Sequence, residues 1–265
     1  MDSDPPTILE VRDLSVGYGG TAIVRGVDFA MGEGEIFVIM GPSGCGKTTV
    51  LKTILGLIPP VRGDVAFRGR SIRDPEGLSL FRRSSGMVFQ QGALLNSASI
   101  EENVSLPLTE HTVFPPGIVR ETVRMKLAQV GLLAFAGRRP GEISGGMRKR
   151  AGIARALAIE PELLLFDEPT GGLDPITADG IDNLILRLRD ELGMSMLVVT
   201  HELASVFKIA DRILMLRDGQ VAALGDRDDL RRSGDEGVRG FVNRQAGSEA
   251  GAADGFLAEV EGGGA

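Results

Sequence analysis

The feature that most constrains this chain is a glycine-rich octapeptide, residues 41–48 (GPSGCGKT), that stands between two regular segments. The five residues before it, 36–40 (IFVIM), are all apolar, which predicts a strand. A helix is expected to run from residue 46 to about residue 57. The pattern G-x-x-x-x-G-K-[ST] between a strand and a helix is the context in which backbone amides wrap around a phosphate group. The sequence therefore predicts a phosphate-binding loop.

The residue types of this loop suit a bound nucleotide with Mg²⁺. Glycine lets the backbone approach phosphate oxygens, and the amides of a helix N-terminus supply positive potential. Lys47 is expected to reach the β- and γ-phosphates, and Thr48 to offer its hydroxyl to Mg²⁺. Cys45 is either a thiol made more acidic by the helix N-terminus or simply a small side chain that fits. The expected ATP-binding residues here are Gly41, Pro42, Ser43, Gly44, Cys45, Gly46, Lys47, Thr48 and Thr49.

Two adjacent carboxylates follow a second apolar strand, residues 163–166 (LLLF), and match the Walker B pattern. Asp167 is expected to hold Mg²⁺ through its outer shell. Glu168 is expected to polarise the attacking water as the catalytic base. A strand followed by Asp-Glu can also be the start of a solvated loop. The phosphate loop in the same chain favours the catalytic interpretation.

A second candidate phosphate site is formed by Ser144, Gly145 and Gly146, which precede a basic helical segment ahead of the Walker B strand. The serine and the two glycine amides stand at a helix N-terminus, which can bind phosphate. The simpler alternative is an ordinary N-capped helix start. Because the chain already has one phosphate loop, a second site makes sense if it completes the nucleotide site of another subunit.

The segment 143–147 (ISGGM) and the helix after it resemble the LSGGQ signature of the ABC ATPase family, over residues 7 to about 240. The resemblance implies two domains that sandwich two ATP molecules head to tail. It also implies an α/β fold: a P-loop NTPase of ABC ATPase type with a RecA-like core, an antiparallel β-subdomain and an inserted helical subdomain. Ile143 and Met147 replace the usual Leu and Gln, and the pair Gly171-Gly172 replaces the common Ser-Ala. None of these changes removes a phosphate, metal or water contact.

The resemblance assigns four further residues. Tyr18 is expected to stack on adenine, although a lone tyrosine can also be a packed loop aromatic. Gln90 is expected to contact Mg²⁺ or the catalytic water, and Asp174 to cross the dimer interface. His201 is expected to contact the γ-phosphate and orient water, although an isolated histidine is more often structural.

The remaining predicted elements place these motifs in one ATPase domain, residues 7–242. A helical stripe at 119, 123, 127 and 130 belongs to a helical signature subdomain of about 91–160, and residues 243–265, rich in Gly and Ala, are expected to form a flexible tail. Further elements are expected as strands at 8–16, 22–31, 87–89, 196–199, 212–216 and 220–224, a hairpin at 63–72 and a helix at 177–192.

Length and composition indicate the compartment in which such a domain works and the partners that it can have. The chain has 265 residues, and none of its apolar runs approaches the length of about 20 residues that is needed to cross a bilayer, which predicts a soluble, cytoplasmic protein. One cysteine excludes an intramolecular disulfide. The net charge of -7 disfavours nucleic acid as a partner.

Segments 89–95, 102–104 and 107–112 resemble the ATP-binding subunits of Mla phospholipid transporters and their Mce-associated relatives. The implied protein is a homodimer that energises permease subunits at the cytoplasmic face of the inner membrane, with an Mce-type lipid-binding protein. An importer ATPase for a small solute or ion and a non-transport ABC ATPase remain alternatives. Residues 90–95 would line the groove that receives a permease helix, although Leu94 and Leu95 can also be core residues.

Overall fold

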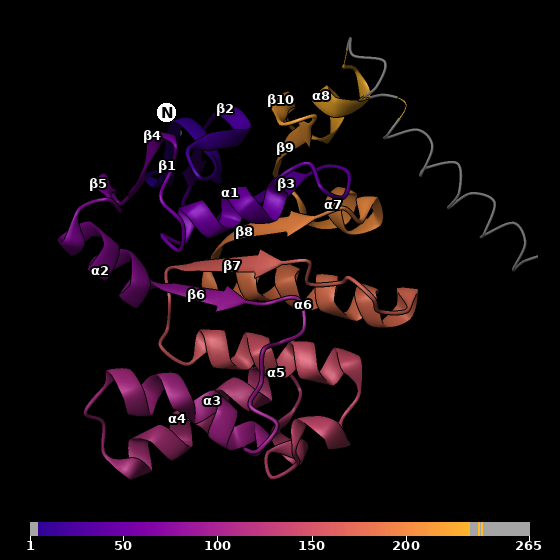
Figure 1. The fold of residues 1–265 in the computed structure, drawn as a ribbon. Coiled ribbons are helices and arrows are strands. Elements are labelled where there is room, and N and C mark those ends of the chain that lie inside the picture. The colour runs from indigo at the N-terminus through magenta and orange to yellow at the C-terminus, as the bar shows by residue number, and fades with distance from the viewer. Residues whose placement is uncertain (1–4, 234–237, 239, 241–265) are drawn as a thin grey trace, which may run out of the picture.

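The computed structural model describes residues 5–233, 238 and 240, which form two sheets with helices around them (Figure 1). The larger sheet has the strand order β10-β9-β3-β8-β7-β6. Five of its strands run parallel, and β10 pairs with β9 as an antiparallel edge hairpin. Its strands are β3 (Ile36–Met40), β6 (Ser85–Val88), β7 (Leu163–Asp167), β8 (Ser195–Thr200), β9 (Arg212–Arg217) and β10 (Gln220–Gly225).

Side chains of β3 alternate between two cores, one on each face of this sheet. Phe37 and Ile39 join a cluster with helix α1 (Lys47–Ile54), whereas Ile36, Val38 and Met40 join the cluster of the opposite face. Every residue of β3 is buried, as expected for a central parallel strand that is covered on both faces.

The second sheet is antiparallel, in the order β2-β1-β4-β5, and packs on the α1 side. Phe29 of its strand β2 stacks on Phe37 of β3 with ring centroids 4.4 Å apart. The amide of Arg25 donates to Gly219 O at the β9–β10 turn, at 2.9 Å. The two sheets are therefore joined by both apolar packing and a main-chain bond. The strands are β1 (Thr7–Tyr18), β2 (Thr21–Gly32), β4 (Arg62–Phe67) and β5 (Arg70–Ser71).

Helices α3 to α8 cover the other face, whereas α2 packs by Phe81 into the cluster on the α1 side. The predicted stripe of α4 is buried at Val123 and Leu127 against α3 and α5. Helix α3 begins at a capping box, in which Ser99 and Glu102 each bind the other's backbone amide. The helices are α2 (Pro75–Ser84), α3 (Ile100–His111), α4 (Pro116–Gln129), α5 (Gly145–Leu157), α6 (Pro175–Leu192), α7 (Leu203–Ile209) and α8 (Arg227–Arg231), with short 3-10 turns at Leu133–Phe135 and Pro140–Glu142.

The predicted fold class is confirmed, and the elements differ from expectation in detail. Helix α1 ends at Ile54, not near residue 57, because Gly56 takes a left-handed conformation with φ 65°. Strand β6 stops at Val88, so Gln90 lies beyond it, and helices α2, α7 and α8 were not predicted. The predicted tail, residues 243–265, lies outside the described residues. No helix within the described residues is long and apolar enough to span a membrane.

Candidate functional site

The phosphate loop leaves β3 at Gly41 and enters α1 at Lys47, and its glycines are required by close approaches. At Gly41, where φ is 152°, an added Cβ would lie 2.2 Å from Leu216 O of β9. At Gly46, where φ is 103°, it would lie 2.2 Å from Val24 Cγ2. Because neither position has room for a side chain, the glycines fix how tightly the loop curves.

Lys47 fills the inside of that curve. Its ammonium is buried and donates to Gly41 O at 2.8 Å and to Pro42 O at 3.0 Å. Helix α1 has no acidic residue in its own first turn, so the helix itself carries no carboxylate that offsets the positive potential of its N-terminus. Burial raises the pKa of the Cys45 thiol. The structure therefore favours the simpler interpretation of Cys45, a small side chain that packs inside the loop.

A hydroxyl and a carboxylate meet beside this loop. Thr48 Oγ1 of α1 donates to Asp167 Oδ1, at the end of β7, over 3.4 Å. Burial raises the pKa of Asp167, and the neighbouring Glu168 carboxylate acts in the same direction. A divalent cation beside Asp167 would favour its ionised form, and oxygen donors of this kind suit Mg²⁺. Among the described residues there is no cluster of three or more His, Cys, Asp or Glu side chains that could hold a metal by themselves.

Glu168 and His201 are brought into direct contact. The two carboxylate oxygens lie 2.9 and 2.8 Å from His201 Nδ1, and Thr200 Oγ1 donates to Oε2 at 3.3 Å. The Glu168 side chain is only 12% exposed, whereas that of His201 is 41% exposed. The pair thus combines a held carboxylate with an accessible imidazole, an arrangement able to orient and deprotonate a water molecule.

Gln90 and Tyr18 lie at the margins of this centre. An added Cβ at Gly171 would lie 3.4 Å from Glu168 Cβ and 3.6 Å from Gln90 Nε2, so the glutamine amide reaches the turn that follows Glu168. Tyr18 pairs with Thr21 at the tip of the β1–β2 hairpin. Tyr18 is 53% exposed, which does not fit the alternative of a packed loop aromatic.

The signature segment lies on the other face of the main sheet. Ser144 caps α5 by accepting from the Met147 amide at 3.3 Å, as the simpler N-cap interpretation requires, and its side chain is exposed. Helix α5 belongs to the core cluster opposite that of α1. In the described part of the chain, no hydrogen bond joins residues 144–146 to the phosphate loop. The structure therefore does not bring the two predicted phosphate sites together within one subunit.

The signature residues contact the loop that carries Asp174 instead. A Cβ atom added at Gly145 would lie 3.6 Å from Leu173 Cδ2, and one added at Gly146 would lie 2.3 Å from Thr177 Cγ2. Asp174 is exposed and caps α6 by accepting from the Thr177 amide at 3.0 Å, and this hydrogen bonding holds the pKa of Asp174 low. Ser144 and Asp174 thus share one exposed surface.

Two buried polar groups beside Glu168 were missed by the sequence analysis. Lys149 of α5 binds the carbonyls that flank the turn after Glu168. Asp182 of α6 accepts from Ser205 of α7, which contacts Thr170 of the same turn. Neither had a usable sequence signal, because Lys149 stands between two arginines and Asp182 in a helix with other acids.

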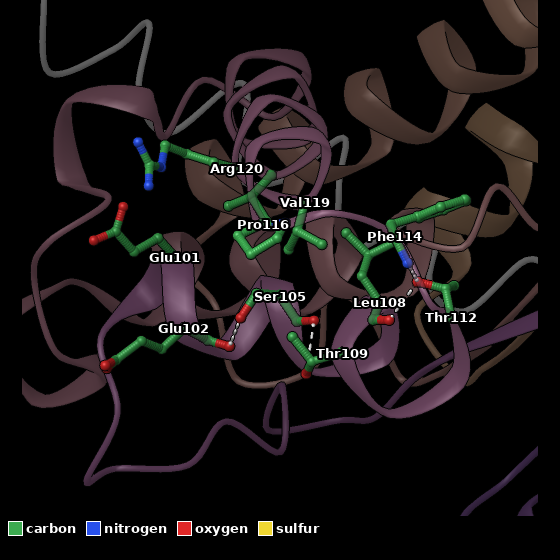
Figure 2. Close-up of a pocket in the computed structure, with 11 residues that line it drawn as sticks. Glu101, Glu102, Ser105, Leu108, Thr109, Thr112, Phe114, Pro116, Val119 and Arg120 are labelled. Atoms are coloured by element: carbon green, nitrogen blue, oxygen red, sulfur yellow. Dashed lines mark hydrogen bonds between the residues drawn. The ribbon is translucent and has the colours of Figure 1, made fainter.

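Two of the hollows that flank the helices differ in character. One, of about 440 Å³, lies between α3 and α4 (Figure 2), with Leu108 and Val119 inside it and Glu101 and Arg120 at one end. It contains no predicted site residue. The other, of about 660 Å³, adjoins residues 168–171, the predicted catalytic turn, and is mostly polar. It is lined by Gln90, Gln91, Ala93, Leu94, Asn96, Gly145, Arg148, Lys149, Gly171, Gly172 and Leu173.

Comparisons with known proteins agree with this geometry. The family model described as ABC transporter matches residues 24–171. The chain is 40% identical to the intermembrane phospholipid transport system ATP-binding protein MlaF of Escherichia coli, over 92% of this chain and 91% of that one. It is 38% identical to the probable ribonucleotide transport ATP-binding protein mkl of Mycobacterium tuberculosis, over 89% of this chain and 66% of that one.

Solved structures show the same architecture. The cbiO1 protein of Clostridium perfringens, part of the ABC transporter complex cbiONQ, superposes with a TM-score of 0.77 and 30% identity, covering 84% of this chain and 89% of that chain. A dimeric ATP-binding cassette in a post-hydrolysis state, bound to ADP and Pi, gives a TM-score of 0.74 and 33% identity, covering 83% of this chain and 98% of that chain.

Proposed function

The chain belongs to the ABC transporter family and is an ATPase coupled to transport, and we propose that it energises a membrane permease for phospholipids in an Mla- or Mce-type system. The observation that carries the lipid assignment is the 40% identity, over 92% of the chain, to a phospholipid transport ATP-binding protein. We propose residues 7–242 as the ATPase domain, with the helical signature subdomain at about 91–160.

Hydrolysis in this proposal follows from the contacts at the carboxyl ends of the strands. The loop amides and Lys47 would hold the β- and γ-phosphates, and Thr48, Asp167 and Gln90 would hold Mg²⁺. When bound, Mg²⁺ would neutralise charge on the phosphate oxygens. Glu168 accepts the proton of the attacking water, while His201 orients that water and contacts the γ-phosphate.

The proposed unit is a homodimer in which each ATP lies between two chains. Ser144, Gly145, Gly146 and Asp174 are expected to act on the nucleotide held by the partner's phosphate loop. Support comes from the exposed surface that Ser144 and Asp174 share, away from the phosphate loop of their own subunit, and from the dimeric state of a solved relative. Tyr18 stacks on the adenine of its own subunit's ATP.

The dimer is proposed to sit at the cytoplasmic face of the inner membrane, where it is attached through permease subunits. An Mce-type lipid-binding protein completes the system. The name of the Mycobacterium tuberculosis relative, a probable ribonucleotide transport protein, supports a second candidate: an importer ATPase for a small polar solute.

Isolation of the intact complex separates these candidates. The tagged chain is purified from its native membrane in mild detergent, and co-purifying proteins and extracted lipids are identified by mass spectrometry. A permease with an Mce-type protein and enriched phospholipid is the expected result. A permease with a solute-binding protein would establish the importer instead, and soluble partners alone would point to a non-transport ATPase.

A cross-link tests the shared site independently of the cargo. Cys45 is the only cysteine, so Cys45→Ser provides a clean background for Ser43→Cys and Ser144→Cys in different chains. Disulfide formation that depends on ATP is expected between the two chains. The matched control is Ser43→Cys alone, and no cross-link above this control would rule out the shared site.

A further inference from the structure

Lys149 occupies an unusual place for a lysine of a helix that begins on the surface. Helix α5 starts at the exposed Ser144 cap, yet Lys149 is only 7% exposed and turns toward the end of β7. Its Nζ donates to Glu168 O at 3.0 Å and to Gly171 O at 2.9 Å. Among the ion pairs of the described residues, none includes Lys149, so its charge is balanced by carbonyl dipoles and by the nearby Glu168 carboxylate.

The main chain that Lys149 binds is itself under constraint. Glu168 has φ 50°, a left-handed conformation that costs free energy for a residue with a side chain. Two main-chain bonds hold this residue in addition to the bond from Lys149. The Glu168 amide donates to Val199 O of β8 at 2.8 Å, and Glu168 O accepts from the Gly171 amide at 3.2 Å. The direction of the Glu168 side chain therefore depends on a few bonds, of which Lys149 supplies the one from α5.

The two neighbours of Lys149 on α5 make no such contact. Arg148 donates to Ile143 O at 2.9 Å, within its own helix start, and Arg150 donates to Gly180 O of α6 at 3.3 Å. The Lys149 ammonium is kept away from water, which costs free energy, and this burial lowers the pKa of Lys149. A buried cation on two carbonyls of the catalytic turn is more than the packing of α5 requires, because an apolar side chain would fill the same space without that cost.

We propose that Lys149 is a positioning residue for the catalytic carboxylate. It ties the signature end of α5 to the main chain of residues 168–171. When Ser144 contacts the partner subunit's nucleotide, the resulting shift of α5 is passed through Lys149 to Glu168 of the same subunit. The inference rests on the proposed function, in which Glu168 is the base and Ser144 acts across the dimer.

The first test compares two buried lysines. Lys149→Met keeps the length of the side chain but removes its charge and donors. Lys126→Met is the control, because Lys126 is 5% exposed, lies on α4 and pairs with Glu160 at 3.1 Å, away from the catalytic turn. We expect Lys149→Met to lower kcat by on the order of 10- to 100-fold through a misplaced carboxylate, with an unchanged Kd for ATP, and Lys149→Arg to restore most of the rate. Lys126→Met should leave kcat of the folded protein unchanged.

A double-mutant cycle with Glu168→Gln provides the decisive readout. If Lys149 acts through Glu168, adding Lys149→Met to Glu168→Gln lowers the single-turnover rate no further, because the group being positioned is already lost. Additive losses, or a kcat of Lys149→Met equal to that of Lys126→Met per folded molecule, would overturn the proposal. If Lys149→Met does not fold, Lys149→Gln takes its place with the same criteria. Failure of the proposed function is seen separately, as normal hydrolysis by Glu168→Gln alone.

Discussion

The carboxyl ends of β7 and β8 contrast with the helix pair α3–α4 in how each region satisfies its polar groups. At the strand ends, Glu168 has a left-handed backbone, Lys149 is buried on carbonyls, and burial raises the pKa of Asp167. The helix pair is joined by apolar contacts, and its buried Lys126 has a carboxylate partner. Glu160, the partner of Lys126, is also left-handed, with φ 52°, so backbone strain does not distinguish the two regions. What differs is that the buried Lys149 is held by carbonyls at the strand ends, where chemistry is proposed, rather than by a carboxylate.

Glu168→Gln should give the largest effect, because it removes the proton acceptor but keeps the shape of the side chain. Turnover should fall by on the order of 10² to 10⁴, the range for loss of a positioned base. ATP binding should persist, and the ATP-bound dimer should accumulate in gel filtration. Near-normal phosphate release by this variant would place the base elsewhere and would remove the catalytic side of the contrast.

Leu127→Ala tests the apolar side of the contrast. Leu127 is fully buried between α4 and its neighbours, so its truncation leaves a cavity that should cost about 2–5 kcal/mol of unfolding free energy. Denaturant unfolding measures this loss, and filter binding of ATP at a temperature where the variant is folded provides the control. We expect the affinity for ATP to be unchanged. A large loss of affinity in the folded variant would show that the helix pair is energetically part of the nucleotide site.

Sequence reasoning predicted the motifs whose chemistry depends on local order. The phosphate loop was identified because its pattern stands between a strand and a helix, and β3 and β7 were evident as apolar runs. Helix α2 was missed because only a few of its positions are apolar and buried. Helix α7 was missed because it has only seven residues. The sequence cannot show that Glu168 is left-handed, because glutamate has no preference for that conformation and long-range bonds impose it.

The same limit applies to partners in space. Lys149 and Glu168 are 19 residues apart, and Asp182 and Ser205 are 23 apart, with no common motif. These contacts exist only because α5, α6 and α7 converge behind the ends of β7 and β8. Residue roles carried by a motif were therefore predictable, whereas supporting contacts made by tertiary packing were not.

Asp182 provides an intermediate test, because it is a buried acid directly behind the catalytic turn. Burial raises the pKa of Asp182 to about 6. The Ser205 hydrogen bond and the charge of Lys208 lower this pKa, whereas the charges of Asp179 and Glu202 raise it further. Its Oδ1 atom has no hydrogen-bond partner. The folded state therefore binds this proton more tightly than the unfolded state does, and the stabilisation is lost as the pH rises from about 4 to about 6.

The corresponding variant is Asp182→Asn, which keeps the shape and carries no charge. Between pH 5 and pH 8 the wild type should lose about 1–2 kcal/mol of unfolding free energy relative to the variant. Urea unfolding of both proteins at the two pH values measures this difference, in which contributions from other groups cancel. An equal pH dependence of the two proteins would show that Asp182 is not the titrating group.

Leu95 should give the smallest effect on the isolated chain, and its comparison with Leu94 separates docking from packing. Leu94 is half-buried and packs against the core of the helical side, whereas Leu95 is 50% exposed in the loop after Gln90. The backbone at Leu95 is held by the buried Asn103, which accepts from Leu95 N at 2.7 Å and donates to Leu95 O at 3.1 Å. The loop conformation therefore does not depend on the Leu95 side chain.

Leu95→Asp should leave the thermal midpoint and basal ATP hydrolysis unchanged but weaken permease association, because it places a charge on the exposed loop after Gln90 that is proposed to receive a permease helix. Leu94→Asp should lower the thermal midpoint, since it brings a charge against the core. Leu192→Asp is the matched control: an equally exposed leucine, 45% exposed, at the far end of α6. Co-purification of permease with each variant measures the outcome. Permease recovered equally with Leu95→Asp and Leu192→Asp would exclude this loop as the docking surface. Loss of permease with Leu95→Asp alone would show that the functional region includes this loop as well as the catalytic turn.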